Sequence, residues 1–496
     1  MIKSSPPATA TAGRTQSRQW WVLGILAIAQ LMIILDVTIV NIALPAAQAD
    51  LGFADDSRQW VITAYSLAFG ALLILGGRIG DRFGRRTTFL VGTAGFAVAS
   101  VLGGLAGNFE VLIAARALQG VFGALMAPAA LGLLTVTFAG SPARGKAFGV
   151  WGAITGAGGA LGLLLGGVLT DYLSWRWCLL VNVIFAAAAL AGYRILPAGT
   201  SAQRTRIDVI SAAIVSAGLF GIVYGFARAE TDGWSDTGTI GSLIAGAVLV
   251  AIFVVRQARV ADPLLPLRVL ADRFRAGALV AVFTAGAGVF GVFLFLTYFM
   301  QLNLGFSAAR SGTAFLPLVV TLGITATLAG ARVLPRTGPL PLFAVGTVAT
   351  TTAMIMMTRF SAATTYWPDV LVPLLIAGVG LGLNFTAAMG TATLGIQARD
   401  AGVGSALINT AQQIGGSIGV ALLSTQSAAA GTDYVTEHLT PAGPTPQLLA
   451  DAALAGYHTA FWWAAGFFVV GGLICLILIP RGRPATATTA TPPAMH

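Results

Sequence analysis

The chain has 496 residues, of which 56% are hydrophobic and only 9% are charged, whereas about a quarter of the residues of a soluble globular protein are charged. This composition, with a mean hydropathy of +0.83, excludes a soluble protein and predicts an integral membrane protein. The net charge of +10 would favour nucleic acid as a partner in a soluble chain, but the placement of the basic residues, described below, excludes that partner.

Apolar runs of about 20 residues predict membrane-spanning helices, because that length crosses a hydrocarbon core of about 30 Å. Fourteen runs predict an all-α integral membrane protein, and an even number places both termini on one side. The first run follows basic residues, as in a signal peptide, but its length favours an uncleaved first helix. The runs are 20–45, 58–76, 87–107, 111–137, 146–169, 175–196, 208–227, 239–256, 275–300, 310–330, 339–358, 368–393, 404–427 and 459–480. The longest outer loop, 428–458, is a hairpin or a small cap.

Basic residues are distributed very unevenly over the connections between these runs. If the N-terminus is cytoplasmic, the inner segments hold 22 of the 28 lysines and arginines and the outer segments hold 5, while Arg116 lies within a run. Cytoplasmic loops of membrane proteins carry such an excess. The distribution therefore predicts a multi-pass protein of the plasma membrane with both termini in the cytoplasm. The predominance of arginine over lysine suggests a bacterial, GC-rich source.

The densest charge cluster lies between the second and third runs, in Gly76-Gly77-Arg78-Ile79-Gly80-Asp81-Arg82-Phe83-Gly84-Arg85-Arg86. Its charges require a membrane surface, and its glycines permit a tight turn. The segment resembles the loop between helices 2 and 3 of major facilitator superfamily transporters. The resemblance implies a cytoplasmic latch between the two halves of the transporter; the alternative is that the arginines only fix topology. The latch residues are Gly77, Asp81, Arg82, Gly84, Arg85 and Arg86.

A degenerate second copy of this turn, at 330–338, aligns with 76–84. Such turns also recur by chance on cytoplasmic faces. Taken as a repeat, it implies the major facilitator fold, with fourteen helices arranged as two six-helix bundles plus two inserted helices. The predicted segments are a disordered cytoplasmic tail (1–19), the N-terminal bundle (20–196), the inserted helices (208–256), a cytoplasmic linker (257–274), the C-terminal bundle (275–480) and a second disordered cytoplasmic tail (481–496).

Asp36 is the acidic residue that we place deep within a membrane span. A carboxylate at that depth is costly to keep charged, so it is a candidate to bind and release a proton. The surrounding segment, Leu35-Asp36-Val37-Thr38-Ile39-Val40-Asn41-Ile42-Ala43-Leu44-Pro45, resembles the first-helix signature of drug:proton antiporters. The alternative is a structural aspartate that is held by hydrogen bonds.

Arg116 lies in Leu112-Ile113-Ala114-Ala115-Arg116-Ala117-Leu118-Gln119-Gly120, which resembles the fourth-helix motif of the family. In that motif the arginine is associated with proton coupling. Counting about 1.5 Å per residue from the predicted helix ends places Asp36 and Arg116 in the same, outer half of the membrane. A buried arginine needs an anionic or carbonyl partner, and Asp36 is a candidate beside water and helix carbonyls.

The fifth run is rich in glycine, and small residues four apart allow helices to pack closely. It resembles the fifth-helix antiporter motif, although Leu163 stands where the motif has proline and removes the expected kink. Its motif residues are Gly158, Gly162, Gly166 and Gly167. A further segment, 402–416, resembles the fourteen-helix branch of the family. Polar residues that either line a substrate cavity or join helices are Asn41, Gln119, Asn409, Gln412 and Gln413.

No phosphate-binding loop motif occurs in the sequence, and its histidines and cysteines do not cluster. We therefore predict neither a cofactor nor a metal site, and we expect a proton gradient to supply the energy. The resemblance implies a drug:proton antiporter, not an enzyme, that exports hydrophobic small molecules, cationic ones included, and contributes to multidrug efflux and antibiotic resistance. The alternatives are a dedicated exporter of one metabolite or self-made antibiotic, and a proton symporter.

Overall fold

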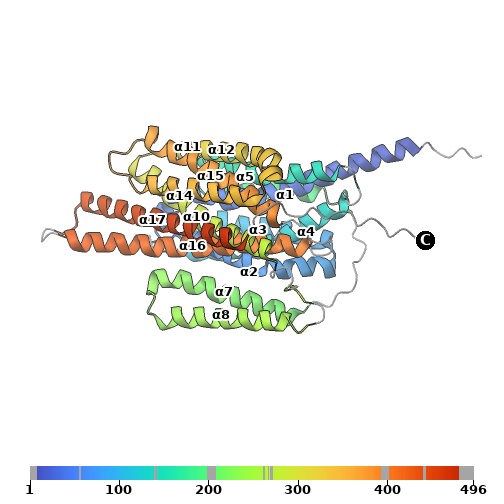
Figure 1. Ribbon diagram of the computed structural model, residues 1–496, viewed down its shortest axis with the longest axis horizontal. Coiled ribbons are helices and arrows are strands. Elements are labelled where there is room, and N and C mark those ends of the chain that lie inside the picture. Colours follow the sequence, from blue (N-terminus) through green and yellow to red (C-terminus); the bar gives the residue numbers. More distant parts are fainter. Residues whose placement is uncertain are drawn as a thin grey trace, which may run out of the picture. The chain divides into compact units, whose positions relative to one another are not determined.

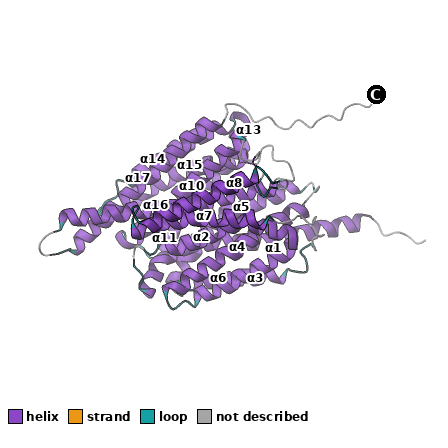
Figure 2. Cartoon of the chain, turned by 90° about the horizontal axis from the view of Figure 1, so that it is seen from below, coloured by secondary structure: helices purple, strands orange, loops and turns teal. Residues whose placement is uncertain are grey.

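The computed structural model describes residues 8–479, except 55–56, 139–140, 142, 198–207, 261–262, 266, 268–271, 393–400 and 440–442. The regular secondary structure of the described residues is helical (Figure 2). Contacts between Cα atoms divide the chain into two compact units. The first unit comprises Met1–Ala212 and Ser307–Thr313, and the second comprises Ala213–Phe306 and Ala314–His496.

The first unit contains six helices that follow one another along the chain. They are α1 (Ala8–Leu51), α2 (Trp60–Phe83), α3 (Arg85–Gly104), α4 (Phe109–Thr137), α5 (Arg144–Tyr172) and α6 (Trp177–Ala191). Helix α4 packs on α2, α3 and α1, and α1 also packs on α5 and α6. A residue on α1 can therefore meet side chains from several other helices of this unit.

Helices α2 and α4 approach closely because glycine stands at their contact. A Cβ atom at Gly76 would lie 2.0 Å from the Ala124 carbonyl oxygen, and one at Gly120 would lie 2.4 Å from that of Tyr65. Helix α2 then turns into α3 through Gly84, whose φ of 95° favours glycine. The charged segment 76–86, which the sequence predicts as a loop, therefore belongs largely to the two helices, and the chain turns at Gly84 between them.

The helices that follow belong to the second unit, except for the start of α7 and most of α11, and short π-helical turns adjoin several of them. They are α7 (Val209–Asp232), α8 (Thr237–Gln257), α10 (Arg273–Tyr298), η1 (Phe299–Asn303), α11 (Ala308–Ala314), α12 (Leu316–Leu328), η2 (Ala329–Val333), α13 (Leu334–Thr337), α14 (Pro339–Met357), η3 (Tyr366–Val370), α15 (Leu371–Ala392), α16 (Ala401–His438) and α17 (Pro446–Leu478). Most of α11 belongs to the first unit by its contacts.

Helices α7 and α8 form a hairpin, in which they lie side by side (Figure 1). A Cβ atom at Gly221 would lie 3.1 Å from the Cα atom of Gly246, so the two backbones nearly touch. At the turn, Asp236 caps α8 by accepting a hydrogen bond from Thr239 N and also pairs with Arg228. Large apolar side chains on the outer face of α8 are exposed, as expected of a lipid-facing surface.

Ten helices of the described residues are long and apolar enough to cross a membrane, and Leu161–Tyr172, Trp177–Ala191 and Ile210–Phe226 are shorter apolar helices. The protein is therefore a multi-pass, all-helical membrane protein.

Three helix ends, those at the start of α1, the end of α16 and the start of α17, lie beyond the predicted spans. Helix α1 begins at Ala8, so the described part of the predicted N-terminal tail is helical, in keeping with its alanine content. Helix α16 continues to His438 and α17 begins at Pro446, so most of 428–458 belongs to two helices that pack on each other. The predicted C-terminal tail lies outside the described residues.

Candidate functional site

Five buried polar residues from four helices of the first unit form one group, with Asp36 at its centre. Asp36 lies on α1, Arg116 and Gln119 lie one turn apart on α4, Asn182 lies on α6 and Ser100 lies on α3. The exposed fraction is 1% for Arg116 and 0% for the other four. Burying so many polar groups is costly unless each of them is hydrogen-bonded, so the contacts within this group determine whether it is stable.

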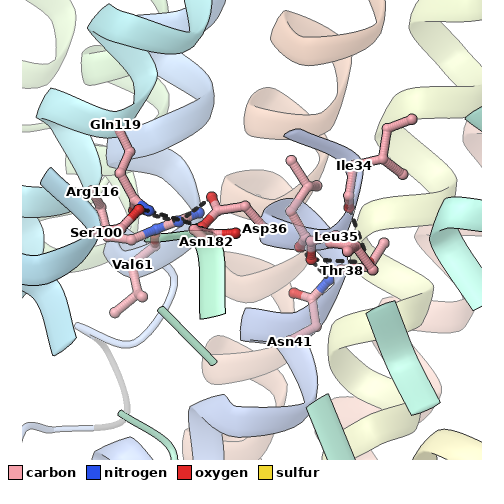
Figure 3. Close-up of polar contacts among 11 residues, drawn as sticks. Ile34, Leu35, Asp36, Thr38, Asn41, Val61, Ser100, Arg116, Gln119 and Asn182 are labelled. Atoms are coloured by element: carbon pink, nitrogen blue, oxygen red, sulfur yellow. Dashed lines mark hydrogen bonds and ion pairs between the residues drawn. The ribbon is translucent and has the colours of Figure 1, made fainter. Parts of the chain in front are cut away.

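The Asp36 carboxylate accepts three hydrogen bonds (Figure 3). Arg116 Nη1 lies 2.5 Å from Oδ2. Gln119 Nε2 lies 2.8 Å from Oδ1 and Asn182 Nδ2 lies 2.7 Å from the same oxygen. Donors from α4 and α6 thus hold a carboxylate that is carried by α1. Because an ionised carboxylate only accepts hydrogen bonds, this arrangement suits the charged form of Asp36.

Arg116 is held by further contacts that fix the direction of its side chain. Its Nε donates to the Val61 carbonyl oxygen at 3.0 Å, and Nη1 also donates to Gln119 Oε1 at 2.8 Å. Its Cζ lies 4.6 Å from the centre of the Tyr65 ring, within the range of a cation–π contact. The arginine and the aspartate neutralise each other, which is the usual condition for burying either charge.

The glycines of α5 bring that helix against α1 on both sides of Asp36. Cβ atoms at Gly158, Gly162 and Gly166 would lie within 3 Å of Ile34, Thr38 and Ile39, respectively. Three of the four predicted motif glycines therefore pack on the helix that carries the carboxylate.

The fourth motif glycine, Gly167, packs against the backbone of Ala308 and Ala309 at the start of α11. Asp171 accepts hydrogen bonds from these two backbone N–H groups, at 3.1 Å and 2.8 Å. This end of α5 therefore holds the segment Ser307–Thr313 within the first unit.

A small cavity of about 10 Å³, which has room for about one water molecule, adjoins Arg116. It lies among α1, α2, α4 and α6, and its other lining residues are Val40, Ala43, Leu44, Ala47, Val61, Leu112, Trp175, Cys178 and Leu179. The cavity is apolar except for the arginine.

Within the turn between α2 and α3, Asp81 pairs with Arg85. Nε and Nη2 of Arg85 lie 3.2 Å and 3.0 Å from Asp81 Oδ1, and Nη1 donates to the Gly132 carbonyl oxygen of α4. Arg82 lies over the Phe83 ring and Arg86 over the Tyr193 ring. These contacts order the turn within the first unit. A latch between the halves of the transporter stays a prediction.

The predicted cavity residues do not form one group. Asn41 donates to the Val37 carbonyl oxygen of its own helix, and Gln119 belongs to the group around Asp36. Gln412 and Gln413 lie on α16 of the second unit, and the side chain of Asn409 lies outside the described ones. No group of three His, Cys, Asp or Glu side chains among the described residues could hold a metal ion.

The structure adds Asn182 and Ser100 to the predicted pair of Asp36 and Arg116. Asn182 is a polar residue within the apolar helix Trp177–Ala191, a signal that could have pointed to it. The sequence gives no such signal for Ser100, because serine is common in membrane helices. Chemically, the group holds one carboxyl group that can take up a proton beside a permanent positive charge.

Comparison with known proteins gives consistent results. Residues 26–420 match the family model of the Major Facilitator Superfamily. The chain is 44% identical over 493 residues to the puromycin resistance protein pur8 of Streptomyces alboniger, covering 99% of this chain and 97% of that protein. It is 36% identical over 481 residues to the cephamycin export protein CmcT of Amycolatopsis lactamdurans, covering 94% and 93%. A crystal structure of the peptide transporter POT in complex with sulfate shares the fold, with a TM-score of 0.66 over 92% of this chain and 94% of that chain at 17% identity.

Proposed function

The chain belongs to the major facilitator superfamily, in its drug-efflux branch, and from this premise we propose that it is a proton-coupled antiporter. Its activity is transport and not enzymatic turnover. It exports a small molecule from a bacterial cell by alternating access, with its substrate site open first to one side of the membrane and then to the other. Inward movement of protons supplies the energy.

The group around Asp36 is the observation that carries the proposal. A carboxylate that is completely buried in a membrane protein is a costly feature, and such residues mark ion pathways and proton relays. Arg116 compensates its charge at 2.5 Å. When Asp36 takes up a proton, the guanidinium loses that compensation and the pair loosens. Protonation thereby changes the forces between α1 and α4, and this change is the coupling step that we propose.

Substrate binding and protonation of Asp36 alternate in this scheme. The charged, paired state of Asp36 accompanies one orientation of the transporter and the protonated state accompanies the other. The turn that contains Asp81 acts as the cytoplasmic latch, and the glycines of α5 allow α1 to shift beside them. Fourteen membrane spans, as two six-helix bundles with α7 and α8 inserted, place both termini in the cytoplasm of a bacterial cell.

The names of the relatives guide the choice of substrate. One relative is a puromycin resistance protein and another a cephamycin export protein, and each name refers to a single class of antibiotic. We therefore favour export of a hydrophobic antibiotic, with puromycin as the first compound to test. Multidrug export is the second candidate, because a relative with 32% identity is named multidrug efflux pump LfrA.

Accumulation assays in an efflux-deficient bacterial host test this function. Cells that express the wild type at matched membrane levels should accumulate less puromycin than cells with an empty vector. The difference should disappear with Asp36→Asn and with a protonophore. A panel of unrelated dyes and drugs then separates a dedicated exporter, which lowers the accumulation of one compound class, from a multidrug pump. Export that survives both treatments would contradict the proposed coupling.

A further inference from the structure

Asn182 is the member of the group around Asp36 that has an unused hydrogen-bonding atom. Its Nδ2 donates to Asp36 Oδ1 at 2.7 Å, and its side chain is completely buried. Its Oδ1 has no hydrogen-bond partner within the described part of the chain. Since a buried unpaired carbonyl oxygen is costly, its presence beside a carboxyl group that changes its protonation state suggests a use for it.

The second amide of the group, that of Gln119, is fixed from both sides. Its Oε1 accepts from Arg116 at 2.8 Å, and its Nε2 donates to both Asp36 and Ser100 at 2.8 Å. Turning this amide over would bring N–H groups of Arg116 and Gln119 face to face. Within the described residues, the bond to Asp36 is the one hydrogen bond of the Asn182 amide, so this amide can turn over at the loss of one bond.

A proton on Asp36 changes what the carboxyl group needs from its neighbours. The protonated group carries an O–H donor, which requires an acceptor in a buried site. The Arg116 guanidinium has only donors, and Gln119 Oε1 already accepts from it. Asn182 Oδ1 belongs to an amide that already touches Asp36 (Figure 3). A half turn of that amide would direct an acceptor at the new proton.

We propose that Asn182 is a positioning residue that hydrogen-bonds Asp36 in both of its protonation states, by turning its side-chain amide over when the proton arrives. This inference rests on the proposed function, in which Asp36 carries the coupled proton. Asn182 keeps the carboxyl group in one orientation throughout the cycle. It also favours the charged form, because a hydrogen bond to a carboxylate is about twice as strong as one between neutral groups.

Few other titratable groups of the described side chains face Asp36. They are Arg116 on α4, Tyr65 on α2, which contacts the arginine, and Cys178 on α6, which lies one turn from Asn182. Helix α5 faces α1 near Asp36 through the glycines described above. A carboxyl group can be told apart from a phenol and a thiol by its infrared C=O band.

Infrared difference spectroscopy of the full-length protein in lipid bilayers tests the proposal. The band of the protonated carboxyl group is followed between about pH 4 and pH 9, and the band that Asp36→Asn removes is assigned to Asp36. In Asn182→Leu, the midpoint of this band should differ from that of the wild type, because the charged carboxylate loses one of its hydrogen bonds. Its frequency should also increase, because the protonated carboxyl group loses its partner.

Two further variants complete the experiment. Asn182→Ala repeats the test with a smaller side chain, in case the leucine does not fit. Asn41→Leu is the matched control, because Asn41 is a buried asparagine on the helix of Asp36 that hydrogen-bonds only its own helix. The control should leave both the midpoint and the frequency of the Asp36 band unchanged.

A midpoint and a frequency like those of the wild type in both Asn182 variants would overturn the proposal. A shifted midpoint with an unchanged frequency would also overturn it, because Asn182 would then bond only the charged form. The proposed function fails separately, if Asp36→Asn exports substrate against a gradient as the wild type does. The infrared result reports the hydrogen bond whether or not transport depends on it.

Discussion

Replacing Arg116 with glutamine removes the charge that compensates Asp36 and leaves the carboxylate in a fully buried site. Two amide donors, from Gln119 and Asn182, remain within 2.8 Å of its Oδ1. Oδ2 loses its donor at 2.5 Å. Removing one partner of a buried ion pair is strongly destabilising, because the other charge stays buried without compensation.

The resulting decrease in the free energy of unfolding has an upper limit that depends on pH. An uncompensated buried charge costs about 3–5 kcal/mol, but the carboxylate can instead take up a proton. For a carboxylate of ordinary acidity, protonation at pH 7 costs about 4 kcal/mol and becomes about 1.4 kcal/mol cheaper for each pH unit below that. The charge-dependent loss in Arg116→Gln should therefore be about 4 kcal/mol at pH 7 and about 2 kcal/mol at pH 5.5.

A double-mutant cycle measures the coupling between residues 36 and 116, which includes this charge-dependent loss. Arg116→Gln also loses its contacts with Val61 and Tyr65, but that loss is the same whether or not residue 36 is charged. Asp36→Asn alone also leaves the buried Arg116 charge without its partner. The double variant should therefore lose at least about 3–4 kcal/mol less than the sum of the two single variants at pH 7. Unfolding in mixed micelles by increasing SDS measures all four proteins. Additive losses, or a coupling that is the same at pH 5.5, would refute the reasoning.

Three other predictions concern the surrounding structure. Asp81→Asn should change the free energy of unfolding by no more than about 1 kcal/mol, because the Asp81–Arg85 pair is about one-third exposed. If this nearly unchanged stability is accompanied by transport far below that of the wild type, the result supports a latch. Unimpaired transport would contradict the latch. Gly166→Ala should lower the free energy of unfolding by about 1–3 kcal/mol, because its Cβ would lie 2.9 Å from the Ile39 carbonyl oxygen. A Cβ atom at Gly159 would have no neighbour within 4 Å, so Gly159→Ala should be neutral or stabilising in the same unfolding assay. The hydrogen bond from the Thr239 N–H group, and then the charge of Arg228, hold the pKa of Asp236 below its usual value of 3.8, although desolvation acts in the opposite direction. Because the folded-state pKa is lowered, this carboxylate stabilises the α7–α8 hairpin above about pH 4. The stabilisation is lost as the pH falls through the folded-state pKa. The difference in unfolding temperature between the wild type and Asp236→Asn should therefore shrink between about pH 5 and pH 3, and a difference that grows on acidification would contradict this assignment.

The sequence allowed the pairing of Asp36 and Arg116 to be anticipated, because the depth of a residue in a membrane helix follows from its distance to the helix end. The structure brings the two residues together at 2.5 Å. Asn182 and Ser100 could not be placed in the same way. Their helices are apolar on most sides, so the sequence carries no periodicity that shows which face points inward.

The sequence also did not predict the helix ends that lie outside the membrane. Hydropathy marks the part of a helix that crosses the hydrocarbon core, and it is silent on turns that continue into water. Helices α16 and α17 continue to His438 and from Pro446, in a region that hydropathy assigned to a loop. The glycines of α5 were recognised as a helix contact, but only the structure shows that α1 is the helix they face.

Proton movement by the purified protein tests the central claim most directly. The protein is reconstituted into liposomes that contain a pH-sensitive dye, and the exported compound identified by the accumulation assay is added on one side. The wild type should move protons in the opposite direction to the substrate, and Asp36→Asn, at equal protein content, should move none. Substrate-driven proton movement that persists in Asp36→Asn would contradict the claim that Asp36 carries the coupled proton.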